Sequence, residues 1–349
     1  AVKRGEADSI AKNPKITDGD RLAFGYISPD GIAQIANVLG VKYGSEASDE
    51  PEIQSAVSGI LPQILRNSVK EVVWQASKRE HEIEDRFSIT IDTELANIFS
   101  ETLKSGPAAN SPSAIFDVIP ISFQSVTLYN LENPQIAWRS LLLAATRKME
   151  SLTGSLVVNF LQGLFEPYGV EDPEKFLGSI KSRLLTVRLN DDDENVAVVT
   201  ESTAEDFYKS ITKTIDFKKP PDEQFEEGQY RKSKDGTLAF INRVKEFEIL
   251  GNTEAVSECS RAYGTDRDWA NDPVFAGFLD SRASAVSVSL DAEIARRIVE
   301  VLAESNTVGP NAKARILTET SFNKTGIERR TVSDFGFIGW IITQFGKEQ

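Results

Sequence analysis

The chain has 349 residues, of which 40% are hydrophobic and 26% are charged, a globular composition that excludes a disordered or fibrous protein. Lys and Arg total 39 against 53 Asp and Glu, so the net charge is -14. A surface this acidic repels phosphate backbones, which argues against a nucleic-acid partner.

The predicted elements follow a repeated order along the chain: a strand, a capping residue and an amphipathic helix. Apolar and polar side chains alternate over 87–91, as they do in a half-buried strand. The pattern recurs at 184–189 and 286–290. Ser28 before Pro29, and Asp92 after the first alternating segment, are residues favoured at helix starts.

Several predicted strands come in pairs, at 69–76 with 87–91, 184–189 with 196–199, 238–241 with 247–250, and 314–322 with 327–332, and each pair except the last precedes a predicted helix. Connections this short force antiparallel neighbours, because a parallel crossover needs a dozen or more residues. The sequence therefore predicts an α+β fold of repeated β-β-α units, with helices packed on one face of an antiparallel sheet. The last pair is expected to have no helix after it.

The chain is long enough for one large domain or two lobes. We expect an N-terminal arm at 1–20, a first lobe with the central helices at 21–181, and a second, pseudo-similar lobe at 182–349. The central helices are marked by apolar residues within 138–149, 156–164 and 173–180. The segment 218–235 contains Pro220-Pro221 and a run of charges, so it is predicted to be a mobile loop.

Few residues are candidates for catalysis. His81 is the one histidine and lies among charged residues, which is typical of a solvated loop. Cys259 is the one cysteine, so no intramolecular disulfide can form. It falls in a predicted helix, where a free cysteine is usually buried in the core. No nucleotide-binding or hydrolase-elbow motif occurs, and we expect no cofactor.

Two acidic loops could attract a cation. Four adjacent acids at 191–194 are typical of a solvated hairpin tip. Asp266, Asp268 and Asp272 alternate better, but the loop lacks the glycine that oxygen-cage loops use to bend the chain. We therefore expect no metal, with these three residues as weak candidates. Trp269 in the same polar loop is the one aromatic residue that we expect to be exposed for a sugar or a protein partner.

The C-terminal segment 335–345 is rich in apolar residues but is shorter than the roughly 18 residues of a spanning helix. We expect it to dock on the body of the protein. The sequence begins at Ala1 without Met. We expect that an upstream segment, such as a signal peptide or a membrane anchor, precedes it.

The layout around three segments is familiar: Val170-Glu171-Asp172-Pro173-Glu174-Lys175-Phe176-Leu177, Ile249-Leu250-Gly251-Asn252 and Ser333-Asp334-Phe335-Gly336. It resembles bacterial proteins of unknown function that are extracytoplasmic and often anchored to the membrane at their N-terminus. The resemblance implies an extracytoplasmic location, periplasmic or secreted. It brings no activity and no site residues.

Two functions remain open. The preferred one is a noncatalytic binding or structural module of the bacterial cell envelope with a protein or glycan partner. The alternative is a hydrolase that uses paired carboxylates from distant loops, since such pairs leave no local signature in a sequence. A pocket with paired, desolvated carboxylates would favour the hydrolase, and a shallow apolar surface would favour the binding module.

Overall fold

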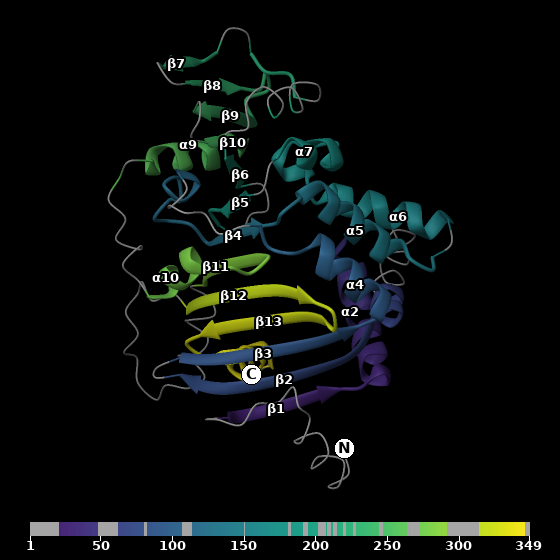
Figure 1. The fold of residues 1–349 in the computed structure, drawn as a ribbon. Coiled ribbons are helices and arrows are strands. Elements are labelled where there is room, and N and C mark those ends of the chain that lie inside the picture. The colour runs from purple at the N-terminus through teal and green to yellow at the C-terminus, as the bar shows by residue number, and fades with distance from the viewer. Residues whose placement is uncertain are drawn as a thin grey trace, which may run out of the picture. The chain divides into compact units, whose positions relative to one another are not determined.

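A computed structural model of the protein describes residues 21–47, 62–79, 82–106, 114–149, 151–180, 183–190, 195–201, 207, 211, 215–218, 221–225, 228–243, 247–263, 265, 273–291 and 314–345. In chain order (Figure 1), the elements are β1 (Arg21–Ile27), α2 (Pro29–Ala47), β2 (Val69–Arg79), β3 (Glu82–Ile91), α4 (Thr93–Thr102), η1 (Ala114–Phe116), β4 (Ser125–Asn130), α5 (Pro134–Thr146), α6 (Ser151–Gly163), η2 (Glu166–Tyr168), α7 (Pro173–Ser179), β5 (Arg183–Arg188), β6 (Val196–Glu201), β7 (Glu223–Phe225), β8 (Gly228–Lys232), β9 (Leu238–Arg243), β10 (Phe247–Asn252), α9 (Thr253–Ala262), α10 (Pro273–Asp280), β11 (Ala285–Asp291), β12 (Ala314–Asn323), β13 (Gly326–Ser333) and α12 (Gly336–Phe345).

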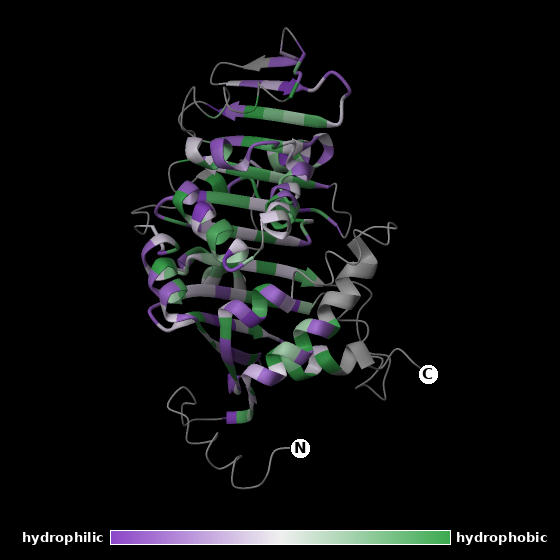
Figure 2. Ribbon diagram, turned by 90° about the vertical axis from the view of Figure 1, so that its right-hand side faces the viewer, coloured by the Kyte–Doolittle hydropathy of each residue, from purple (hydrophilic) through white to green (hydrophobic). Residues whose placement is uncertain are grey.

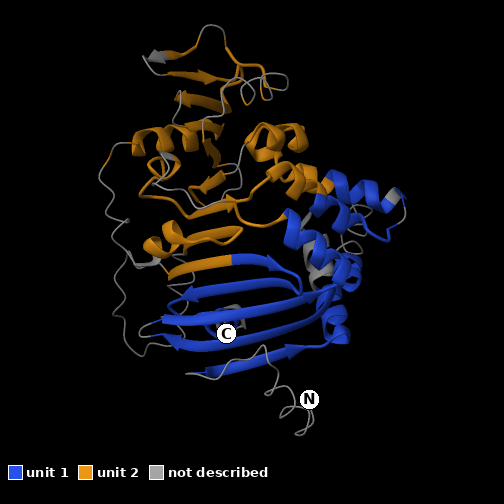
Figure 3. Cartoon of the chain, in the orientation of Figure 1, with its two compact units in different colours: residues 1–102, 140–159, 320–349 blue, residues 103–139, 160–319 orange. Residues whose placement is uncertain are grey.

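The chain forms two compact units, each assembled from separate stretches of sequence (Figure 3). Unit 1 comprises residues 1–102, 140–159 and 320–349, and unit 2 comprises 103–139 and 160–319. This grouping does not test whether the sequence divides at 181/182 into two similar lobes, which stays a prediction. The expected N-terminal arm at 1–20 lies outside the described residues.

Unit 1 is built on an antiparallel sheet in which β1, β2, β3 and β13 are neighbours in that order. Successive side chains of β3 lie on opposite faces of the sheet, because side chains alternate along a strand. Phe87 lies opposite Trp74 of β2 on one face, where the ring of Phe337 from α12 contacts both, with centroids at 5.3 and 5.6 Å. Glu84 and Arg86 point to the other face.

Unit 2 is built on antiparallel strands in the order β11, β4, β5, β6, β10, β9, β8, β7. Fully buried side chains from neighbouring strands, including Leu185, Val199 and Ile249, form its core. Figure 2 shows hydrophobic residues along β9 and hydrophilic ones along β8, where the core ends.

Helices cover both faces of the unit 2 sheet, so the prediction of helices on one face is wrong for this unit. Phe240 lies opposite Leu250, so Phe240 and Phe247 point to opposite faces. Phe247 contacts Tyr263 after α9 at 5.1 Å between centroids, whereas Phe240 stacks on Phe207 at 6.0 Å. Phe207 in turn contacts a ring of α7, and Figure 1 shows α9 and α7 on opposite sides of β10.

Two further expectations are wrong. The last strand pair is followed by a helix, α12, whose first N–H, that of Gly336, donates to the Ser333 hydroxyl at 2.9 Å. The predicted mobile loop at 218–235 contains the strands β7 and β8. β7 pairs with β8, and β8 pairs with β9, through the backbone. This pairing outweighs the loop-forming composition of the segment 218–235.

The coarser expectations are confirmed. The fold is mixed α+β with antiparallel sheet, and the three central helices are present as α5, α6 and α7. Within the described ranges, no helix is long and apolar enough to cross a membrane.

Candidate functional site

Most residues singled out from the sequence lie outside the described residues. These are Trp269, the weak cation candidates Asp266, Asp268 and Asp272, the acidic run at 191–194, and His81. Across the part of the chain that the structure describes, no group of three or more His, Cys, Asp or Glu side chains could hold a metal ion.

Cys259 is the exception, and its predicted core role is confirmed. The side chain on α9 is fully buried. Burial raises the pKa of its thiol to about 12, with a further contribution from the charge of Glu258. A thiol that stays protonated at neutral pH is a poor nucleophile. Cys259 therefore packs as a small apolar residue.

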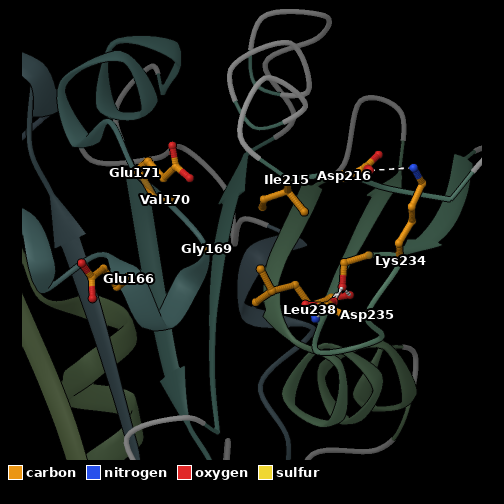
Figure 4. Close-up of a pocket in the computed structure, with 10 residues that line it drawn as sticks. Glu166, Gly169, Val170, Glu171, Ile215, Asp216, Lys234, Asp235 and Leu238 are labelled. Carbon is orange, nitrogen blue, oxygen red and sulfur yellow. Dashed lines mark hydrogen bonds and ion pairs between the residues drawn. The ribbon is translucent and has the colours of Figure 1, made fainter.

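Within unit 2, a pocket of about 440 Å³ lies between two walls (Figure 4). One wall is η2 and the residues that follow it, up to Glu171. The other wall combines the short segment at 215–216 with the β8–β9 turn at 233–238. The three segments are far apart in the sequence, and the fold of this one unit brings them together.

The floor of the pocket is apolar. Ile215 and Val170 are 7% and 4% exposed, and Leu238, at the start of β9, extends from the second wall to Gly169 of the first. The β8–β9 turn is held by the first residue of α9, because the backbone N–H of Thr253 donates to the Thr237 carbonyl at 2.9 Å. The floor is therefore fixed by backbone contacts to a packed helix.

Gly169 allows the first wall to approach this floor. Its φ of 71° lies in the left-handed region, where a side chain adds strain. A Cβ at this position would lie 2.4 Å from Leu238 Cδ1 and 3.0 Å from Ile215 Cδ1. Both the backbone conformation and the available space therefore require glycine.

The rim carries charges of both signs. Asp216 and Lys234 form an exposed ion pair, with 2.6 Å between Oδ2 and Nζ. Asp235 accepts hydrogen bonds from the Ser233 hydroxyl at 2.5 Å and from the Thr237 backbone N–H at 3.1 Å. These bonds, that of Ser233 first, hold the pKa of Asp235 below its usual value. Asp235 is thus ionised at neutral pH.

On the opposite wall, Glu166 and Glu171 are both exposed to solvent. A general acid in hydrolysis needs a carboxyl group whose pKa is raised, usually by burial in apolar surroundings. The four carboxylates of the lining are exposed, ion-paired or stabilised in the charged form, so the arrangement suits binding of a cation better than proton transfer.

No single pattern in the sequence predicts this pocket. Asp235-Gly236 is a turn signal and could have located one wall. No local pattern connects that turn to Gly169 or to Ile215, because the contact between them depends on the tertiary fold.

No family model matches the sequence, and no curated protein matches it. Two crystal structures of TP0453 from Treponema pallidum are similar in part. Crystal form I has 10% identity over 61% of this chain and 75% of TP0453, with a TM-score of 0.32. Crystal form III has 8% identity over 68% of this chain and 100% of TP0453, with a TM-score of 0.33. Scores this low carry neither a fold nor a function from TP0453 to this chain.

Proposed function

We propose that the protein is a noncatalytic binding module whose unit 2 pocket receives a ligand with an apolar stem and a positively charged tip, in the first instance a basic segment of a partner protein. The observation that carries the proposal is an apolar floor, Ile215 and Leu238, below an acidic rim. Four carboxylates and one ammonium group give the lining a formal charge of -3.

The side chains of lysine and arginine have the complementary structure, with an aliphatic stem and a charged head. The stem would cover Ile215, Val170 and Leu238, and the head would reach Glu166 or Glu171. Apolar contact and charge would then act on the same side chain. Pockets that combine a mostly apolar lining with a few converging polar groups are the usual form of a ligand site.

The hydrolase alternative has less support. Asp216 is ion-paired with Lys234, and hydrogen bonds favour the charged form of Asp235. A glycan partner is also less favoured at this pocket, because sugar sites usually offer an aromatic platform and no aromatic residue lines the described pocket. Trp269 stays a proposed contact for a sugar or a protein partner.

The proposal includes location in the bacterial cell envelope, periplasmic or secreted. Its support is the layout of the sequence, which resembles extracytoplasmic proteins. Cell fractionation of the producing organism tests it. We also propose that the β-β-α units, seen as β2-β3-α4, β9-β10-α9 and β12-β13-α12, belong to two pseudo-similar lobes.

The binding test is a fluorescence-polarisation titration with a labelled peptide of alternating leucine and lysine. We expect saturable binding that weakens as salt is added, because exposed charges are screened. The same peptide with glutamate in place of lysine should not bind. Binding of the acidic peptide with equal affinity would contradict the proposal.

A matched pair of variants locates the binding. Glu166→Gln with Glu171→Gln removes two rim charges and should weaken binding about fivefold, since exposed charge pairs contribute roughly 0.2–1 kcal/mol each. Glu132→Gln with Glu254→Gln removes two exposed charges of unit 2 outside the pocket. This control should bind like the wild type, and equal losses in both variants would rule out the pocket.

A further inference from the structure

The second wall of the unit 2 pocket carries a cation of its own. Lys234 in the β8–β9 turn is the one positively charged residue among the described residues of the lining, and its Nζ lies 2.6 Å from Oδ2 of Asp216. The two side chains are 66% and 73% exposed, and Figure 4 shows them reaching toward each other. Asp216 directly follows Ile215 of the floor. The group that neutralises Asp216 is therefore part of the pocket itself.

Backbone contacts hold this wall in place. Phe217 and Ser233 form an antiparallel bridge, and the side chains of both residues are buried. One residue further along, the backbone N–H of Lys234 donates to the Asp216 carbonyl at 2.9 Å. Because side chains alternate along paired segments, Asp216 and Lys234 lie on the exposed side. Their charged groups can therefore exchange partners while the backbone stays fixed.

An ion pair as exposed as this one is weak, because water solvates both charges and the long lysine side chain loses rotamer freedom when it is held. The ammonium or guanidinium group of a ligand offers Asp216 the same charge. The ligand also brings an apolar stem for the floor residues Ile215 and Leu238. Exchange of one cationic group for another is near balance in charge, and the apolar contact favours the ligand.

We propose that Lys234 sets the affinity of this pocket for cationic ligands: its ammonium group occupies Asp216 in the free protein, and a cationic group of the ligand displaces it. The inference rests on the function proposed above. It adds Asp216 on the second wall to the two contacts proposed on the first wall, Glu166 and Glu171. A purely structural ion pair would have the opposite signature, because its loss would loosen the wall and weaken binding.

The experiment repeats the peptide titration with variants of single lysines. Lys234→Gln changes the formal charge of the lining from -3 to -4 and should bind the leucine–lysine peptide roughly twofold to fivefold more tightly, the effect of one exposed ion pair. Lys234→Arg keeps the charge and should bind like the wild type. Lys218→Gln is the matched control, because Lys218 pairs with Asp222 and neither residue belongs to the lining. Binding by Lys234→Gln that is no tighter than binding by this control would overturn the inference.

A second arm observes the displacement itself by NMR of protein that contains isotope-labelled lysine. The Cε–Hε signal of Lys234 should shift as the unlabelled peptide is added and saturate with it, whereas the signal of Lys218 should stay in place. Saturable binding without a change at Lys234 would show that the internal pair stays closed, which overturns the inference and leaves the proposed function standing. Absence of binding by both the wild type and Lys234→Gln would overturn both.

Discussion

The indole N–H of Trp74 donates a 2.8 Å hydrogen bond to Oδ1 of Asp85 across the β2–β3 pair. The second carboxylate oxygen accepts the backbone N–H of Phe337, at 2.7 Å, in the first turn of α12. Asp85 is 1% exposed, so one buried carboxylate links two strands to the C-terminal helix. Burial raises its pKa, although both hydrogen bonds act in the opposite direction.

This raised pKa predicts a pH dependence of stability. An unfolded aspartate titrates near pH 3.9, and the folded Asp85 titrates higher. Between the two pKa values the folded state binds more protons than the unfolded state, so the free energy of unfolding falls as pH rises through this window. Asp85→Asn should remove this contribution. Urea unfolding of both proteins from about pH 4 to pH 7 measures it, and parallel stability curves would contradict the prediction.

Removal of α12 should expose the apolar face of the unit 1 sheet. Phe337 covers Trp74 and Phe87, and water contact with this surface costs about 25 cal/mol per Å². We expect a chain truncated after Ser333 to be insoluble or to lose cooperative unfolding. Phe337→Ala keeps the helix and should destabilise the fold by about 1–3 kcal/mol. A truncated chain that stays soluble and unfolds cooperatively would show that α12 is dispensable to the fold.

Gly169 and Gly236 provide a matched comparison at the pocket. Both have a left-handed backbone, with φ of 71° and 81°. A Cβ on Gly169 would overlap Leu238, whereas one on Gly236 would meet nothing within 4 Å. Gly236→Ala should cost about 1 kcal/mol of stability from the backbone alone. Gly169→Ala should cost a further 1–3 kcal/mol or so from overpacking.

The same two variants also test ligand binding. Gly169→Ala changes the pocket floor and should weaken the leucine–lysine peptide, while Gly236→Ala should not. Chemical denaturation and the peptide titration give the two measurements. Equal losses of stability in the two variants would mean that the close contact with Leu238 is relieved at little cost.

Cys259 should resist thiol reagents in the folded protein, because it is fully buried and its thiol pKa is about 12. Cys259→Ser places a hydroxyl among apolar neighbours and should destabilise the protein by about 1–3 kcal/mol. Cys259→Ala, which adds no polar group, is the control and should cost less. Rapid labelling without denaturant would show that the thiol is accessible.

The strand pairs could be predicted because their signals are local. Alternation over 87–91 and the short connections at 69–91 and 238–250 are visible in the sequence alone. Helices on both faces of the unit 2 sheet were not predicted, although the sequence contains a signal for them. Val196–Val199 is an unbroken apolar run, and such runs are typical of strands buried on both faces.

Non-local contacts account for the other differences. Gly336 and Gly339 lower the helix propensity of the C-terminal segment, yet α12 forms. The packing of Phe337 on Trp74 compensates for this low propensity. The pocket depends on three segments, at 166–171, 215–216 and 233–238, that no sequence spacing connects. Its residue types are ordinary, and only their placement distinguishes them.

The central claim, that the pocket in unit 2 binds a cationic side chain on an apolar floor, is tested most directly by methyl NMR. Ile215 and Leu238 carry methyl groups on the floor, and their signals can be followed as the leucine–lysine peptide is added. We predict that both methyl signals shift and saturate at the peptide concentration that saturates the polarisation signal. Saturable binding with no change at Ile215 and Leu238 would contradict the claim.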